Sequence, residues 1–160
     1  MPHTAPLLME IRQLTPNAAA QACEVVRQSI THCCVLDHAG DPKVLNAWLA
    51  NKTEQQFTAC MAAPRAMAWG AYRGDEMVGF ALVSHATLAL CYVVPAVLHQ
   101  GVGGALLQAA EEGARQAGVS ELALESTRTA QAFYLRKGYV PAGAVQAWAG
   151  LCAQPLRKRL

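Results

Sequence analysis

Charged residues are scarce in this sequence: Asp, Glu, Lys and Arg together make up 15% of its 160 residues, and the net charge is only +2. A field this weak does not attract a polyanion, so we expect no nucleic-acid partner. The short basic run at residues 157–159 is typical of a solvated terminus. Apolar residues reach 53%, the opposite of the balance in disordered chains. We therefore expect one globular domain over residues 1–160.

Paired cysteine spacings and long apolar runs are also missing. The six cysteines show no C-x-x-C spacing, and their density favours reduced thiols. The histidines and cysteines have no metal-ligand spacing, so we expect no metal. No stretch reaches the roughly 18 apolar residues of a membrane span, and the first nine residues lack the basic flank of a signal sequence. We therefore expect a cytoplasmic protein with no membrane partner.

Alternating and helical patterns predict a layered arrangement of strands and helices. The expected strands are residues 7–14, 66–73, 77–84, 87–94 and 120–125, with one or two more after residue 139. The expected helices are residues 18–32, 42–50, a short one from 53, 101–116 and 129–137. Asp41 and Thr53 are expected to cap two of these helices. The pattern favours an α/β or α+β layered fold around one mixed sheet.

A glycine-rich turn leads from an expected strand into an expected helix, with the sequence Leu98-His99-Gln100-Gly101-Val102-Gly103-Gly104-Ala105. Unpaired amides at the positive end of a helix converge there, which is a geometry that binds phosphate. Gly101 and Gly103 leave room for an anion that a Cβ would obstruct. The turn lacks the lysine of a Walker loop, and Leu106 stands where a dinucleotide fingerprint needs glycine or alanine. On these residues alone, a turn that binds nothing is an equal alternative.

A second motif follows the strand expected at 120–125 and reads Ala130-Gln131-Ala132-Phe133-Tyr134-Leu135-Arg136-Lys137-Gly138-Tyr139. Together the two motifs resemble the GNAT superfamily of N-acetyltransferases, which combines a Q/R-x-x-G-x-G/A turn with a later A-x-x-F-Y-x-x-x-G-F/Y segment. The second pattern is matched at every defined position. The first departs at Leu98, where the family carries glutamine or arginine, which affects one side-chain contact. The resemblance covers about residues 77–141.

The resemblance implies a GNAT-like single domain with a mixed sheet of about six to seven strands flanked by helices, in which strands 87–94 and 120–125 splay apart at the CoA site. It implies acetyl-CoA, or another acyl-CoA, as co-substrate. In the family, free amides of the first of these strands bind the pantetheine arm and polarise the thioester carbonyl. The residues placed at the cofactor are Cys91, Tyr92, Val93, His99, Gln100, Gly101, Val102, Gly103, Gly104, Ala105, Thr127, Ala130 and Phe133.

Tyr134 matches the tyrosine that many members of the family use as general acid toward the CoA sulfur. A phenol with a pKa near 10 is protonated at neutral pH and can donate to a thiolate as it forms. The alternative is that Tyr134 packs in the core beside Phe133. The doublet of Phe133 and Tyr134 in this motif favours the catalytic interpretation.

The acceptor side is less defined. Residues 87–94 contain no carboxylate, so no general base is identified there. Glu125 ends a strand, and Asp37 and His38 lie in the loop that covers the acceptor in the family; with Trp48, these are the candidates for substrate contact. Each has a structural alternative, namely a surface acid, a turn or cap, or core packing. The implied acceptor is a small-molecule or protein amine, and family members often form homodimers.

Three functions stay open. The favoured one is transfer of an acetyl or acyl group to a primary amine by direct attack in a ternary complex. The second is a catalytically silent acyl-CoA-binding or sensor domain, which the missing strand carboxylate keeps open. The third is a thiol enzyme that uses Cys33, Cys34 or Cys91 with a histidine and needs no CoA.

Overall fold

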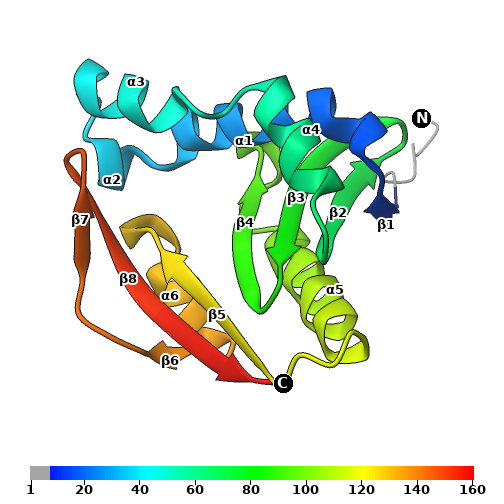
Figure 1. Ribbon diagram of the computed structural model, residues 1–160. Coiled ribbons are helices and arrows are strands. Elements are labelled where there is room, and N and C mark those ends of the chain that lie inside the picture. Colours follow the sequence, from blue (N-terminus) through cyan, green and yellow to red (C-terminus); the bar gives the residue numbers. More distant parts are fainter. Residues whose placement is uncertain (1–7) are drawn as a thin grey trace, which may run out of the picture.

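The structure is a computed structural model that describes residues 8–160 (Figure 1). Residues 1–7, which include the start of the first expected strand and most of the N-terminal segment, lie outside this range. The described strands are β1 (Met9–Leu14), β2 (Ala66–Arg73), β3 (Glu76–Ser84), β4 (Thr87–Val93), β5 (Glu121–Ser126), β6 (Val140–Pro141), β7 (Gln146–Trp148) and β8 (Leu151–Arg159). The α-helices are α1 (Ala19–Cys33), α2 (Val35–His38), α3 (Pro42–Leu49), α4 (Glu54–Ala62), α5 (Val102–Gln116) and α6 (Arg128–Arg136), with short 3₁₀ turns at Pro16–Ala18 and Pro95–Val97.

The sheet has eight strands within residues 8–160, in the order β1-β2-β3-β4-β5-β8-β6, with β7 beside β8. Every pairing is antiparallel except the one between β4 and β5. The mixed α/β fold is therefore confirmed. The segment after residue 139 forms three strands rather than one or two, and α2 was not expected from the sequence.

Capping side chains explain the starts of α3 and α4. The side chain of Asp41 accepts a hydrogen bond of 2.9 Å from the amide of Lys43 at the start of α3, and Pro42 follows as the first helical residue. The hydroxyl of Thr53 accepts a hydrogen bond of 3.2 Å from the amide of Gln56 at the start of α4. Both expected caps are confirmed.

Helices cover both faces of the first four strands. Helix α5 packs against β2, β3 and β4 on one face, and α1 and α4 pack on the other. Helix α6 packs against β5 and β8. Apolar side chains from all these elements form a buried core. Lys158 links β8 to α5, because its ammonium donates hydrogen bonds of 2.8 and 3.0 Å to the two carboxylate oxygens of Glu111. No helix within residues 8–160 is both long and apolar enough to cross a membrane.

The parallel strands β4 and β5 are joined at one end only. Their register contains the single pair Thr87 and Ala123, where the amide of Ala123 donates 2.9 Å to the carbonyl of Ala86. Beyond that pair the strands diverge and leave a gap between the β4 and β5 halves of the sheet (Figure 1). The splay expected from the resemblance is therefore confirmed. We call this separation the β4/β5 gap.

Candidate active site

The edge of β4 that faces the β4/β5 gap carries unpaired backbone groups. The amide of Val94 donates 3.0 Å to the carbonyl of Val78 on β3. Because successive residues of a strand direct their amides to opposite sides, the amides of Cys91 and Val93 point away from β3 and toward the gap. These are two of the three strand residues that the resemblance places at the cofactor.

The glycine turn starts α5 with free amides. Gly101 stands at the helix N-cap with a φ of 82°, and His99 is also left-handed, with a φ of 60°. The first helical bond joins the amide of Ala105 to the carbonyl of Gly101 at 3.1 Å. Within residues 8–160, the amides of residues 102–104 donate to no protein acceptor. Since they lie at the positive end of the helix dipole, they suit an anion.

Two cationic side chains that sequence reasoning missed lie beside this turn. The Lys137 ammonium lies 3.3 Å from the point where a Cβ on Gly104 would stand. A guanidinium nitrogen of Arg73 donates to the side-chain oxygen of Gln100, whose nitrogen donates 3.0 Å to the carbonyl of Ala96. Lys137 lies inside the second motif and was open to detection there. Arg73 ends a strand far away in the sequence and carries no local signal.

Helix α6 begins close to α2, and its first amides are already paired. The amide of Arg128 donates 2.7 Å to Asp37, and the amide of Thr129 donates 3.3 Å to the same carboxylate. The amide of Ala130 donates 3.1 Å to the hydroxyl of Thr127. Of the two helix starts, that of α5 is free for a ligand and that of α6 is capped by protein groups. The hydroxyl of Thr127 and the amide of Ala130 are therefore hydrogen-bonded to each other. Their contact with the cofactor stays a prediction.

Tyr134 is buried, close to Cys91 and Tyr92 of β4. Its ring meets Phe133 and Tyr139 edge-on, with centroids 5.2 and 5.6 Å apart. Cys91 and Tyr92 of β4 are its neighbours on that strand. Burial first, and then the neighbouring Cys91 and Tyr92, raise the pKa of Tyr134 well above its usual value. The phenol is thus fully protonated at neutral pH and lies close to Cys91 of β4.

The thiols of Cys33, Cys34 and Cys91 are protonated as well. Burial raises the pKa of Cys91 to about 12 and that of Cys34 to about 12. Burial also raises the pKa of Cys33. Because the thiolate is the reactive form, these cysteines are poorly suited to act as nucleophiles at neutral pH. Within residues 8–160, no three His, Cys, Asp or Glu side chains gather in a group that could hold a metal ion.

The four predicted substrate residues lie in different surroundings. Asp37 is engaged by α6, as described above. His38 is buried, with Nε2 at 3.0 Å from the carbonyl of Ile30 and Nδ1 accepting 3.0 Å from the amide of Gly40. The buried Trp48 meets the His38 ring edge-on at 6.5 Å, and Glu125 is exposed on β5. These contacts supply the structural role that was the alternative for His38 and Trp48, and substrate contact stays a prediction for all four.

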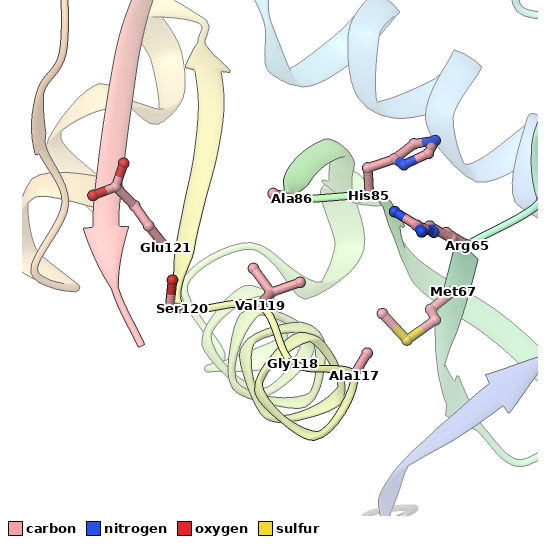
Figure 2. Close-up of a pocket in the computed structure, with 9 residues that line it drawn as sticks. All are labelled: Arg65, Met67, His85, Ala86, Ala117, Gly118, Val119, Ser120 and Glu121. Atoms are coloured by element: carbon pink, nitrogen blue, oxygen red, sulfur yellow. The ribbon is translucent and has the colours of Figure 1, made fainter.

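A surface cavity lies away from these residues. It has a volume of about 600 Å³ and is lined by Arg65, Met67, His85, Ala86 and residues 117–121. Figure 2 shows Arg65 and His85 on one side of it and the connection from α5 to β5 on the other. This is the closed end of the β4/β5 gap, next to the pairing of Ala123 with Ala86. None of the predicted site residues lines this cavity.

A family model for the acetyltransferase (GNAT) domain matches residues 21–160. The chain belongs to the GNAT acetyltransferase family. Among curated proteins, no match to this GNAT sequence was found.

Solved structures share the GNAT fold of this chain. A GCN5-related N-acetyltransferase from Rhodopseudomonas palustris is 24% identical, with a TM-score of 0.84 and 99% of each chain covered. The PaiA N-acetyltransferase of Thermoplasma acidophilum, solved in complex with coenzyme A, is 20% identical, with a TM-score of 0.77 over 96% of this chain and 99% of that one. A GNAT-family acetyltransferase from Desulfovibrio desulfuricans is 23% identical, with a TM-score of 0.66 over 95% and 99% of the two chains.

Proposed function

We propose that this GNAT protein transfers an acetyl group from acetyl-CoA to a primary amine of a small molecule or a protein, by direct attack in a ternary complex. The observation that carries the proposal is the free start of α5, with three unpaired amides and two neighbouring cations. It follows the end of β4, the strand whose Cys91 lies close to Tyr134. A diphosphate carries the charge that such a helix start favours.

The residues fit a CoA molecule in a defined order. The amides of residues 99–104 and the cations Arg73 and Lys137 would hold the pyrophosphate, because charge-assisted bonds to phosphate oxygens are among the strongest that proteins make. Gly103 and Gly104 have no side chains that would keep a ligand away from the backbone there. The gap-facing amides of Cys91 and Val93 would then bind the pantetheine arm and the thioester carbonyl. Phe133 lies beside Gly103, with Cζ 3.7 Å from the point where a Cβ would stand.

In the transfer itself, the acetyl thioester supplies an activated acyl group. The amine nitrogen forms a bond to the acyl carbon as the bond from that carbon to sulfur breaks. Tyr134 gives its proton to the departing sulfur, and the proton that the amine loses restores the phenol through solvent, so that charge and protons balance. Amides directed at the carbonyl oxygen stabilise the negative charge that develops there. Strand β4 carries no carboxylate, so the proton of the amine leaves through water or another group.

A catalytically silent acyl-CoA-binding domain is the second candidate, and the absence of a carboxylate from β4 favours it. It shares the cofactor site and differs in having no turnover. The thiol-enzyme alternative has less support, because burial keeps Cys33, Cys34 and Cys91 protonated.

Thiol release from acetyl-CoA, measured across panels of small amines, amino acids and amine-bearing peptides, tests the proposal. The expected result is release that depends on an added amine, together with a rise in melting temperature when CoA is added. If CoA raises the melting temperature and no amine releases thiol, the silent domain is the better description. If CoA changes neither, the cofactor site itself is wrong.

A further inference from the structure

Residues 33–42, called the roof segment here, cross the open end of the β4/β5 gap. At one end, the Cys33 thiol lies 3.8 Å from the carbonyl of Val93 on the gap edge of β4. At the other end, α2 packs against α6 and β8. Figure 1 shows α1, α2 and α3 passing above the gap from the β4 side to the β8 side. The roof segment therefore bridges the two halves that the splay separates.

Helix α2 needs tertiary contacts to hold this position. It has four residues, which is too short for a helix to be stable by its own backbone bonds. Its two apolar residues contribute little burial, since Val35 is 53% exposed and Leu36 is 66% exposed. The remaining two residues, Asp37 and His38, make the side-chain hydrogen bonds of α2. The position of the roof segment thus depends on these two neighbouring side chains.

His38 attaches the roof segment to α1. Its Nε2 lies 3.0 Å from the carbonyl of Ile30 and 3.2 Å from that of Thr31, which belong to the last turns of α1. Because Nδ1 accepts the amide of Gly40, the proton of the neutral ring sits on Nε2 and is donated to these carbonyls. These contacts join segments that are close in sequence, so they fold the turn after α1 and do not reach the other half of the sheet.

Asp37 attaches the roof segment to α6, across 91 positions of sequence. Its carboxylate accepts the amides of Arg128 and Thr129 and, in addition, the hydroxyl of Thr129. A negative charge at the positive end of a helix is favourable, and charge-assisted hydrogen bonds are about twice as strong as neutral ones. Helix α6 carries Tyr134 one to two turns further on. Asp37 thus connects the roof of the gap to the helix that bears the proposed general acid.

We propose that Asp37 is a positioning residue that holds the roof segment closed over the β4/β5 gap and so shapes the side from which the acceptor amine enters. The proposal rests on the proposed function, because the gap matters to an acceptor only if the thioester lies along β4. This role requires no contact of Asp37 with the cofactor or with the reacting atoms. It acts through α2 on one side and through the start of α6 on the other.

The kinetic test compares Asp37→Asn with Asp41→Asn. Both residues lie in the roof segment, and each carboxylate accepts hydrogen bonds from the first amides of a helix. Asp41 accepts only the local amide of Lys43. Asparagine keeps the size of Asp37 and removes its charge. The expected result for Asp37→Asn is an acceptor KM raised about tenfold, the size of one lost charge-assisted bond, with kcat changed less than about threefold and an unchanged CoA dissociation constant. Asp41→Asn is expected to leave all three constants nearly unaltered.

An activity-independent test uses Cys34, the buried residue at the N-cap of α2. If Asp37 holds the roof segment closed, Asp37→Asn should raise the rate of iodoacetamide labelling at Cys34 severalfold, and Asp41→Asn should not. Thr129→Val, which removes only the hydroxyl donor, should give a smaller increase. Labelling is read by mass spectrometry of the peptide at pH 8 in native conditions.

The two tests separate the two proposals. An active protein in which Asp37→Asn leaves the acceptor KM unchanged overturns the positioning role, even if labelling of Cys34 rises. Equal labelling of wild type and Asp37→Asn overturns the idea that Asp37 holds the roof segment. If the wild type binds CoA but releases no thiol with any amine, the proposed function fails, whereas the labelling result still decides whether Asp37 closes the gap.

Discussion

The Lys137 ammonium occupies the space beside Gly104 that a side chain at that position would need, at 3.3 Å from the site of its absent Cβ. The end of α6 and the start of α5 therefore meet where a phosphate is expected, and each contributes something different. Helix α5 supplies free amides, and α6 supplies a mobile positive charge at the end of a flexible side chain.

Replacing Lys137 with methionine should weaken CoA binding about three- to tenfold, because a solvent-accessible cation next to phosphate oxygens contributes modestly. The length of the side chain is kept, so the melting temperature without ligand should change little. Calorimetric titration with CoA measures the effect, and its salt dependence should also decrease. Arg136→Met is the matched control: it removes the same charge one position earlier, and an equal loss there would contradict a specific role for Lys137.

The two glycines of the turn should respond differently to alanine. Gly101 has a φ of 82°, so Gly101→Ala forces a left-handed alanine and should destabilise the protein by about 1 kcal/mol. Gly103 is helical, and a Cβ there would meet only Phe133 at ordinary contact distance. Gly103→Ala should therefore leave stability equal or slightly higher, yet obstruct a phosphate and weaken CoA binding about tenfold or more.

Urea unfolding and CoA titration of both variants check this contrast. A Gly103→Ala protein that binds CoA as tightly as the wild type would show that no ligand approaches the backbone at that residue.

Tyr134→Phe should lower kcat at least about tenfold and leave CoA binding nearly intact, since only the donated proton is lost. Tyr139→Phe is the control, because its ring lies beside Tyr134 while its hydroxyl donates 3.4 Å to Glu111 instead. Its turnover should stay close to that of the wild type. Steady-state thiol release measures both, and equal turnover of Tyr134→Phe and wild type would remove the catalytic role.

The raised pKa of Tyr134 also predicts part of the pH profile. Because the phenol keeps its proton well above its usual pKa of about 10, kcat should not fall through deprotonation of Tyr134 between pH 7 and about 10. Rates measured at saturating substrate across that range test this. A loss of kcat centred near pH 8 that disappears in Tyr134→Phe would contradict it.

Alkaline pH should destabilise the fold through its buried thiols. In the native state Cys34 and Cys91 hold their protons to about pH 12, whereas in the unfolded chain a thiol titrates near about 8.5. Between these values the unfolded state binds fewer protons, so the free energy of unfolding falls as pH rises, by up to about 1.4 kcal/mol per pH unit for each thiol. The contribution is fully present below about pH 8.

Urea midpoints at pH 7 and pH 10, under reducing conditions, measure this slope. Cys91→Ala should show a shallower decline because one of the two groups is gone. The same decline in both proteins would mean that the pKa of the Cys91 thiol is not raised in the native state.

The sequence by itself determined the features that depend on neighbours along the chain. Helical spacing located α1 and α5, and alternation located β2 to β5, because burial of one face imposes a period within each element. The caps at Asp41 and Thr53 and the left-handed Gly101 follow from bonds and dihedral angles within a few residues. The two motifs also sufficed to indicate the family and, through it, the splay of β4 from β5.

Only the tertiary structure decided which distant residues meet. The hydrogen bond between Asp37 and the start of α6 spans 91 positions, and Arg73 at the end of β2 contacts Gln100 in the glycine turn. No periodic pattern within one element indicates either contact. Helix α2 has one turn, too short for a periodic signal, and residues 140–150 are all exposed, so their strands carry no buried alternation. The local sequence determined which backbone amides of the glycine turn are free. The packing of α6 against it determined which charge lies beside them, because side chains far apart in sequence are brought together only by the folded core.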